Sequence, residues 1–234
     1  MEGSAVFLQP AYILQHRPYR ESSVLLDAFT RDFGIISVLA KGVRKEKSKL
    51  AGVLQPFSLL KLSYLDKNEL KILTHAEYLT SYSLEKLGLY CGFYVNELVQ
   101  KFLHKYDPHP QLFFCYQTCL QALLDSKNIE QCLRYFELDL LEEVGYGVQL
   151  DIEQARNKAV ASQRRYKYIV NVGMVEDKEG DIGGNTLLAL STKAQLSEEI
   201  LIEAKHLLRQ MLNIHLQGKP LKSREVLAKI IKYL

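Results

Sequence analysis

Short apolar runs separated by turn signals fill the first eighty residues, a pattern that predicts β-strands. The runs cover residues 6–8, 11–14, 24–29, 35–40, 57–65 and 70–73. Turns are expected at Arg17 and Pro18, at residues 31–34, where Gly34 suits a positive φ, and at residues 66–69. About five short strands in this length indicate a small β-barrel.

The apolar period lengthens to that of a helix from about residue 82. Helices are expected over residues 87–102, 111–124 and 129–144, with a hairpin at about 164–190 and basic helices within 197–234. The predicted fold class is therefore α+β and multidomain. An OB-fold β-barrel, a fold that commonly binds oligonucleotides, occupies residues 1–80. An α-helical domain with a small β-hairpin insertion occupies residues 81–234.

Composition limits the class of protein. With 47% hydrophobic residues, 13 Gly and 6 Pro, the chain is expected to fold around a sizeable core. No uncharged apolar stretch approaches the roughly 18 residues that span a bilayer, and residues 1–4 lack the basic start of a signal peptide. We therefore expect a soluble protein of a cytoplasm-like compartment, with no membrane partner.

The net charge of +3 is unevenly distributed. Residues 1–80 carry eleven Lys or Arg against eight Asp or Glu, residues 81–203 carry twelve against eighteen, and residues 204–234 carry seven against one. The densest cluster is at residues 41–49 (KGVRKEKSK), with five cations and one acid. Like charges this close repel one another unless solvent or a polyanion offsets them, so the cluster points to nucleic acid.

Eight cations of the predicted barrel are candidate phosphate contacts: Arg17, Arg20, Arg31, Lys41, Arg44, Lys45, Lys47 and Lys49. The same region holds five aromatic residues, Tyr12, Tyr19, Phe29, Phe33 and Phe57. Cationic grooves with aromatic platforms bind single strands, because phosphates attract the charge and bases stack on the rings. Aromatic side chains suit a barrel core as well. The residues alone leave open DNA binding, RNA binding by an OB module, and a scaffold that binds an acidic protein surface.

The sequence contains no recognisable catalytic motif. Its Gly218–Lys219 pair precedes Pro220, which lacks the hydroxyl that a P-loop gives to magnesium. The acidic residues at 177–181 resemble a calcium loop, but the glycines stand at the wrong offsets. The cysteines lie in segments of helical period and fit buried thiols better than zinc ligands; they are Cys91, Cys115, Cys119 and Cys132. We therefore expect no enzyme activity, no cofactor and no metal site.

Two groups of short motifs carry a family resemblance. In the first half they are residues 16–22 (HRPYRES), Phe29-Thr30 followed by Gly34, residues 41–44 (KGVR) and residues 54–57 (LQPF). Later ones are residues 92–98 (GFYVNEL), 134–138 (RYFEL), 145–147 (GYG) and 218–225 (GKPLKSRE). No single motif is diagnostic, but in this order and over nearly the whole chain they resemble the bacterial RecO family of recombination mediators.

The resemblance implies a non-enzymatic mediator of DNA repair and homologous recombination. Such a protein binds single- and double-stranded DNA and anneals complementary strands coated by single-stranded-DNA-binding protein (SSB). With RecR it assists RecA loading in the RecF pathway, in the bacterial cytoplasm at the nucleoid. Many family members also carry a four-cysteine zinc site in the C-terminal domain. Residues 148–190 of this chain contain no cysteine, so we expect the hairpin to stand without zinc.

The resemblance further implies a site for the acidic C-terminal tail of SSB in the helical domain. Arg134, the sole cation of residues 129–144, is the candidate together with Leu133 and Leu138. Its guanidinium would meet the peptide carboxylates while the apolar end of the peptide fills a helix groove. The alternative is an intrahelical ion pair of Arg134 with Glu130 or Glu137.

Overall fold

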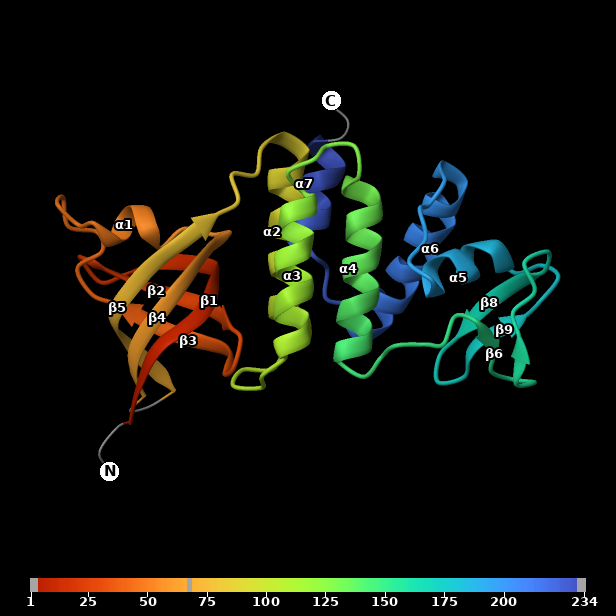
Figure 1. The fold of residues 1–234 in the computed structure, drawn as a ribbon, viewed down its shortest axis with the longest axis horizontal. Helices are drawn as coiled ribbons and strands as arrows, with labels where there is room; N and C mark the ends of the chain where they lie inside the picture. Colours follow the sequence, from red (N-terminus) through yellow and green to blue (C-terminus); the bar gives the residue numbers. More distant parts are fainter. Residues whose placement is uncertain (1–3, 67–68, 231–234) are drawn as a thin grey trace. The chain divides into compact units, whose positions relative to one another are not determined.

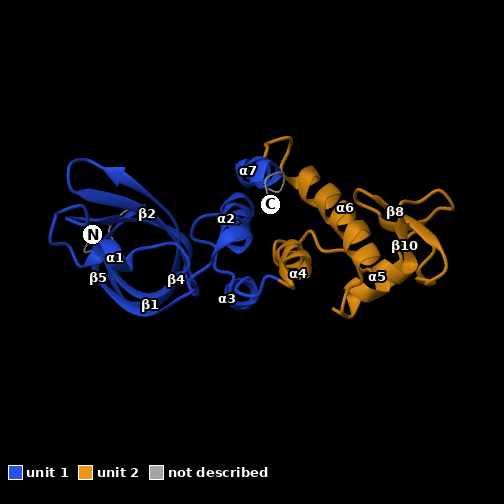
Figure 2. Cartoon of the chain, turned by 90° about the horizontal axis from the view of Figure 1, so that it is seen from above, with its two compact units in different colours: residues 1–126, 221–234 blue, residues 127–220 orange. Residues whose placement is uncertain are grey.

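The computed structural model describes residues 4–66 and 69–230 of the 234-residue chain. They form two compact units, one from residues 1–126 with 221–234 and the other from residues 127–220 (Figure 2). The first unit contains the barrel, and the second contains helices and small antiparallel sheets (Figure 1). The mixed α+β class is therefore confirmed.

Five strands close the barrel in the order β1, β2, β3, β5, β4. They are β1 (Ser4–Tyr19), β2 (Ser23–Thr30), β3 (Gly34–Ala40), β4 (Ser58–Asp66) and β5 (Leu70–Ser81), and α1 (Leu50–Val53) stands between β3 and β4 in the chain. All pairs are antiparallel except β3 with β5. A small closed barrel of five strands agrees with the predicted OB fold.

Each predicted apolar run forms part of a barrel strand, because alternate residues of a strand point inward. The buried core includes Ala11, Ile13, Leu26, Ile36, Val38, Leu60, Leu62 and Tyr64. The runs at residues 6–8 and 11–14 belong to one strand, β1, whose pairing with β4 shifts between Val6 and Gln9. A β-bulge at that point lets one long strand serve two neighbours.

The turn predicted at Arg17 and Pro18 is wrong. Both residues lie in β1, where Pro18 is the register partner of Val24, and the chain turns at residues 20–22 instead. Since β4 pairs with β1 only as far as Tyr12, Pro18 has a neighbouring strand on one side alone. A proline is tolerated where its missing N–H faces away from the ladder.

The turn between β2 and β3 confirms the prediction for Gly34. Its φ is +63°, and its carbonyl accepts a hydrogen bond from the Thr30 hydroxyl at 2.7 Å. A Cβ here would clash with the Asp107 carbonyl oxygen, so the glycine also lets that segment approach the barrel. The turn expected at residues 66–69 includes residues 67 and 68, which lie outside the described residues.

A buried amide joins the barrel to two helices, α2 (Lys86–Phe102) and α3 (Pro110–Ala122). The Asn96 side chain of α2 donates to the Leu14 carbonyl of β1 at 2.8 Å. It also accepts from the Tyr116 hydroxyl of α3 at 2.6 Å. One side chain thus fixes a strand and two helices of the first unit.

We expect Asn96→Ala to lower the free energy of unfolding by about 2 kcal/mol, because it removes two buried hydrogen bonds. Urea unfolding followed by circular dichroism measures the change. Gln100→Ala, one turn later on the same helix and less buried, is the matched control and should cost less than about 0.5 kcal/mol. Equal losses for the two variants would show that Asn96 does not hold the barrel to the helices.

The C-terminal helix α7 (Lys222–Ile230) packs on α2 in the first unit. The Glu97 carboxylate of α2 accepts hydrogen bonds from the backbone N–H of Lys222 at 3.0 Å and of Ser223 at 2.8 Å. It also accepts from the Ser223 hydroxyl at 2.6 Å. A carboxylate in this position satisfies open N–H groups and complements the helix dipole. The basic C-terminal segment is therefore divided: its part from residue 221 onward belongs to the same unit as the barrel, and residues 204–220 belong to the other unit.

In the second unit, α4 (Ile129–Glu143) and α5 (Gly184–Ser191) both contact α6 (Glu198–His215). The strands β8 (Arg165–Ile169) and β9 (Gly173–Glu176) form a hairpin to which β10 (Ile182–Gly183) adds, and β6 (Ile152–Glu153) pairs with β7 (Lys158–Ala159). The hairpin insertion is confirmed, but residues 184–190 of its predicted range begin α5 instead.

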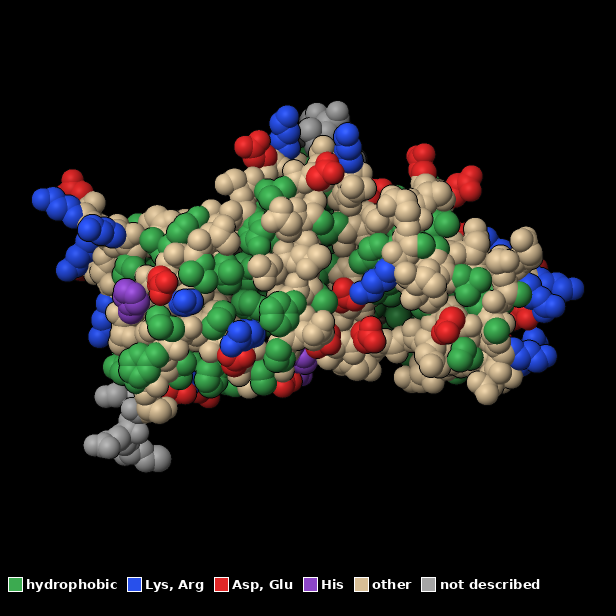
Figure 3. Space-filling view, in the orientation of Figure 1, with side chains coloured by type: hydrophobic (Ala, Val, Ile, Leu, Met, Phe, Trp, Pro, Cys, Tyr) green, Lys and Arg blue, Asp and Glu red, His purple; other side chains and the backbone are tan. Residues whose placement is uncertain are grey.

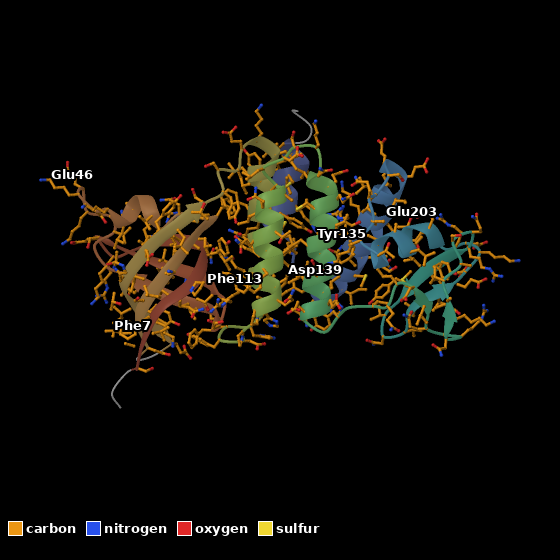
Figure 4. The ribbon with its side chains drawn as sticks, in the orientation of Figure 1. Phe7, Glu46, Phe113, Tyr135, Asp139 and Glu203 are labelled. Carbon is orange, nitrogen blue, oxygen red and sulfur yellow. The ribbon has the colours of Figure 1, made fainter. Side chains whose placement is uncertain are left out.

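Glu203 of α6, labelled in Figure 4, fastens the small sheet to that helix. Its carboxylate accepts from Arg165 Nη1 at 2.7 Å, from the Gly183 N–H at 2.8 Å and from the Thr186 hydroxyl at 2.5 Å. Burial raises the pKa of Glu203, but these donors outweigh it and the pKa lies below its ordinary value. The carboxylate is thus held in its charged form.

Candidate nucleic-acid interface

The basic loop, residues 41–49, leaves β3 at one end of the barrel and leads to α1. Val43 anchors it with a side chain that is 5% exposed and part of the barrel core. The Arg44 N–H donates to the Ser22 carbonyl at 2.9 Å. Around this anchor the five cations of the loop are exposed (Figure 3), and Figure 4 labels Glu46 at its outer end. The loop therefore presents its charges from a fixed base.

The turn between β1 and β2 brings Arg20 to the basic loop. The Arg44 guanidinium donates to the Arg20 carbonyl at 3.1 Å, and Arg20 has a positive φ of 51°. The Arg20 guanidinium lies 5.3 Å from the centre of the Tyr19 ring, a cation–π arrangement. Arg17 is exposed three residues earlier on β1. Seven of the eight predicted cations therefore gather at this end of the barrel.

Few acidic groups neutralise this seven-cation surface, which consists of Arg17, Arg20, Lys41, Arg44, Lys45, Lys47 and Lys49. Within the part of the chain that the structure describes, none of the seven forms an ion pair. Glu21 and Glu46 are the acids in the same two segments. Cations without carboxylate partners maintain a positive potential that attracts a polyanion.

Arg31 is not part of the seven-cation surface. It follows β2, whereas the loop and Arg20 meet at the start of β2, so the length of a strand separates them. Its guanidinium forms two hydrogen bonds with the Asp32 carboxylate, both at 2.9 Å. That contact holds the pKa of Asp32 below its ordinary value. The charge of Arg31 is therefore already paired.

The aromatic residues of the barrel do not form a platform beside the loop. Tyr12, Phe29 and Phe57 are buried. Phe33 is exposed but lies in the β2–β3 turn with Arg31, where its ring packs edge-on against Tyr64. Tyr19 alone of the five stands beside the basic loop, half-buried under Arg20. The surface is thus suited to phosphates more than to stacked bases.

The second predicted site, around Arg134, is mostly inside the protein. Arg134 is 6% exposed, and its guanidinium contacts Glu137, itself 2% exposed, at 2.6 Å. Leu133 is also buried. The ion pair with Glu137 is the alternative that the sequence left open. A peptide carboxylate could reach the Arg134 guanidinium only if the packing around it opened.

Leu138 is separated from the other two residues because it lies half-buried at a pocket of about 430 Å³ in the second unit. Leu141, Leu190 and Met211 supply further apolar walls. At the rim, Lys193 Nζ contacts Asp139 Oδ1 at 2.5 Å, and Figure 4 labels Asp139 on α4. Sequence reasoning missed Lys193, because 54 residues separate it from Asp139 and no local pattern marks the pair.

Comparison with known proteins identifies the family. Residues 4–82 match the family model described as "Recombination protein O N terminal", and residues 87–225 match "Recombination protein O C terminal". The chain belongs to the RecO family. The resemblance noted in the sequence motifs is therefore confirmed.

Relatives in the RecO family align over almost the whole chain. "DNA repair protein RecO" of Methylococcus capsulatus is 42% identical over 228 residues, which cover 96% of this chain and 94% of the relative. The protein of the same name from Nitrosococcus oceani is 41% identical over 231 residues, with the same coverage. That from Aliivibrio salmonicida is 37% identical over 224 residues and covers 94% of each chain.

All four cysteines lie in helices. Cys91 is in α2, Cys115 and Cys119 are in α3, and Cys132 is in α4. Among the described residues, no three His, Cys, Asp or Glu side chains gather as metal ligands. In residues 4–66 and 69–230 there is also no helix long and apolar enough to cross a membrane. The absence of zinc stays a prediction, to be checked by metal analysis of the purified protein.

Proposed function

We propose that this RecO family member is a recombination mediator that works without a catalytic step. It binds single- and double-stranded DNA, anneals complementary strands coated by SSB, and with RecR assists RecA loading. A general role in DNA repair and recombination follows from family membership. DNA binding and annealing rest on one observation above all, the seven-cation surface without ion-pair partners, whereas the roles of SSB, RecR and RecA rest on the family resemblance. We place the protein in the bacterial cytoplasm, at the nucleoid.

The seven-cation surface can lower the electrostatic barrier to annealing. Two complementary strands repel each other through their phosphates, and cations that displace counterions from both strands lower that barrier. Contacts to phosphates carry no sequence information, so any complementary pair is a substrate. The basic loop is anchored to the barrel and its cationic side chains are exposed, so it can bring several cations to the phosphate backbone of DNA at once.

We expect the protein to accelerate the annealing of SSB-coated complementary strands without ATP. Fluorescence quenching between labelled strands measures the rate, and bare strands and SSB lacking its tail serve as controls. The tailless SSB should lower the acceleration if the tail recruits the protein. A rate that depends on ATP, or no acceleration on either bare or coated strands, would refute the proposed function.

We further propose that the second unit binds the acidic SSB tail, with Arg134, Leu133 and Leu138 as contacts. Arg134 can meet a tail carboxylate only if the packing around its buried guanidinium opens. Arg134→Ala and Leu138→Ala should each weaken binding of a tail peptide about tenfold, measured by fluorescence anisotropy. If Leu138→Ala alone weakens binding, Arg134 is not a contact; if neither does, the site is elsewhere.

A further inference from the structure

Two adjoining hollows lie where the β1–β2 turn meets the basic loop. The first, the Arg44 hollow, has a volume of about 730 Å³ and is lined by Arg20, Glu21, Ser22, Ser23 and Arg44. The second, the Lys41 hollow, has a volume of about 400 Å³, and its walls include Tyr19, Arg20, Ser22, Lys41 and Lys45. Because Arg20, Ser22 and Ser23 belong to both, the hollows share one wall.

Hydrogen bonds hold Arg44 in place, and a cation–π contact orients Arg20. The Arg44 backbone N–H and guanidinium bind the Ser22 and Arg20 carbonyls, 22 and 24 residues earlier in the chain. Arg20 sits at a positive φ and above the Tyr19 ring, so its guanidinium has a defined direction. Lys47 and Lys49 line neither hollow. The cations of the surface therefore differ in how far their positions are fixed.

We propose that the two hollows hold two successive phosphates of one nucleic-acid strand. Arg44 contacts the phosphate in the first hollow, and Lys41 and Lys45 contact the phosphate in the second. Arg20 lies between the two hollows and contacts both phosphates. Guanidinium forks match phosphate oxygens, and the Ser22 and Ser23 hydroxyls are further donors. This inference rests on the proposed DNA binding and divides its surface into cations that line the two hollows and cations that lie outside them.

The Glu21 carboxylate favours an internal phosphate over a strand end. It lines the Arg44 hollow together with Arg20 and Arg44. A phosphodiester carries one negative charge, whereas a terminal phosphate carries nearly two at neutral pH and is repelled more strongly by the carboxylate. The expected ligand is therefore the backbone of a continuous strand.

The test compares two substitutions that remove the same charge from the same loop. Arg44→Ala should weaken binding of an oligothymidylate about tenfold, because it removes a fixed, charge-assisted contact. Lys49→Ala, outside both hollows, should weaken it about threefold or less. Both should lower the salt slope by about 0.7. Fluorescence anisotropy of the full chain measures affinity, and thermal unfolding checks that each variant folds.

Two more measurements make the result decisive. Arg44→Lys keeps the charge but loses the fork, so it should retain the salt slope and still lose affinity. A 5′-phosphate on the oligonucleotide should change affinity less than twofold. Equal losses of affinity in Arg44→Ala and Lys49→Ala, or wild-type affinity of Arg44→Lys, would overturn the assignment of phosphates to the two hollows while leaving DNA binding intact. Tighter binding of the phosphorylated strand that depends on Arg44 would overturn the assignment to an internal phosphate. A wild-type protein that binds no DNA would refute the proposed function itself.

Discussion

Alanine at all five cations of the basic loop should lower the salt slope of single-stranded DNA binding by about 3.5. The five are Lys41, Arg44, Lys45, Lys47 and Lys49. Each cation that meets a phosphate of a single strand contributes about 0.7 to the slope of log affinity against log salt. Across a fourfold rise in salt, the wild type should therefore lose about 100-fold more affinity than the variant.

The matched control removes five other exposed lysines, none of them in the barrel: Lys101, Lys158, Lys178, Lys219 and Lys229. The change in net charge is the same, so a general effect of charge would appear equally in both variants. We expect the control to change the slope by less than about 1. An unaltered slope in the loop variant would place the DNA elsewhere, and a competing RNA of equal length tests whether the surface prefers DNA.

Arg134→Ala should lower the free energy of unfolding by about 3 kcal/mol. The guanidinium and the Glu137 carboxylate are both almost fully buried, and Arg134→Ala removes this ion pair from a carboxylate in the interior. The ion pair of Lys205 with Glu130 is a useful contrast, since both side chains are more than half exposed. Lys205→Ala should cost less than about 1 kcal/mol. Urea unfolding monitored by circular dichroism measures both.

A double substitution separates the ion pair from simple packing. Arg134→Met with Glu137→Leu replaces both charges by apolar side chains of similar length and should recover most of the lost stability. If the double variant is as unstable as Arg134→Ala, the packing of the long side chain matters more than its charge. A loss below about 1 kcal/mol for Arg134→Ala would show that the pair with Glu137 contributes little to stability.

The barrel was predictable because its strands follow a local rule. Short apolar runs marked every strand, and Gly34 marked a turn that needs a positive φ. The turn predicted at Pro18 was wrong because a local turn signal does not show whether the residue lies where a strand has a neighbour on one side only, which tolerates proline. The contact of α7 with Glu97 joins residues more than 120 positions apart, so the hydrophobic period of α7 could not show that this helix belongs to the first unit.

The candidate interface was predictable as a set of charges and not as a geometry. Charge density alone picked out the loop, whereas the anchoring of Val43 and the contact of Arg44 with Arg20 join segments that the sequence separates. The sequence grouped Arg31 with the other cations of the barrel, whereas in the structure its guanidinium is paired with the Asp32 carboxylate. Arg134 could not be placed, because an arginine on an amphipathic helix faces either solvent or the interior according to what packs around it.

The contact of Glu97 with α7 affects when the first unit can complete its folding during synthesis. Residues 127–220 leave the ribosome between the two segments that this contact joins. Domains usually fold as they emerge, N-terminal first, yet here the first unit gains α7 only after residues 127–220 have been synthesised. A fragment ending at residue 126 would present the Glu97 carboxylate with nothing to cap, so the barrel unit cannot be obtained whole by a single cut.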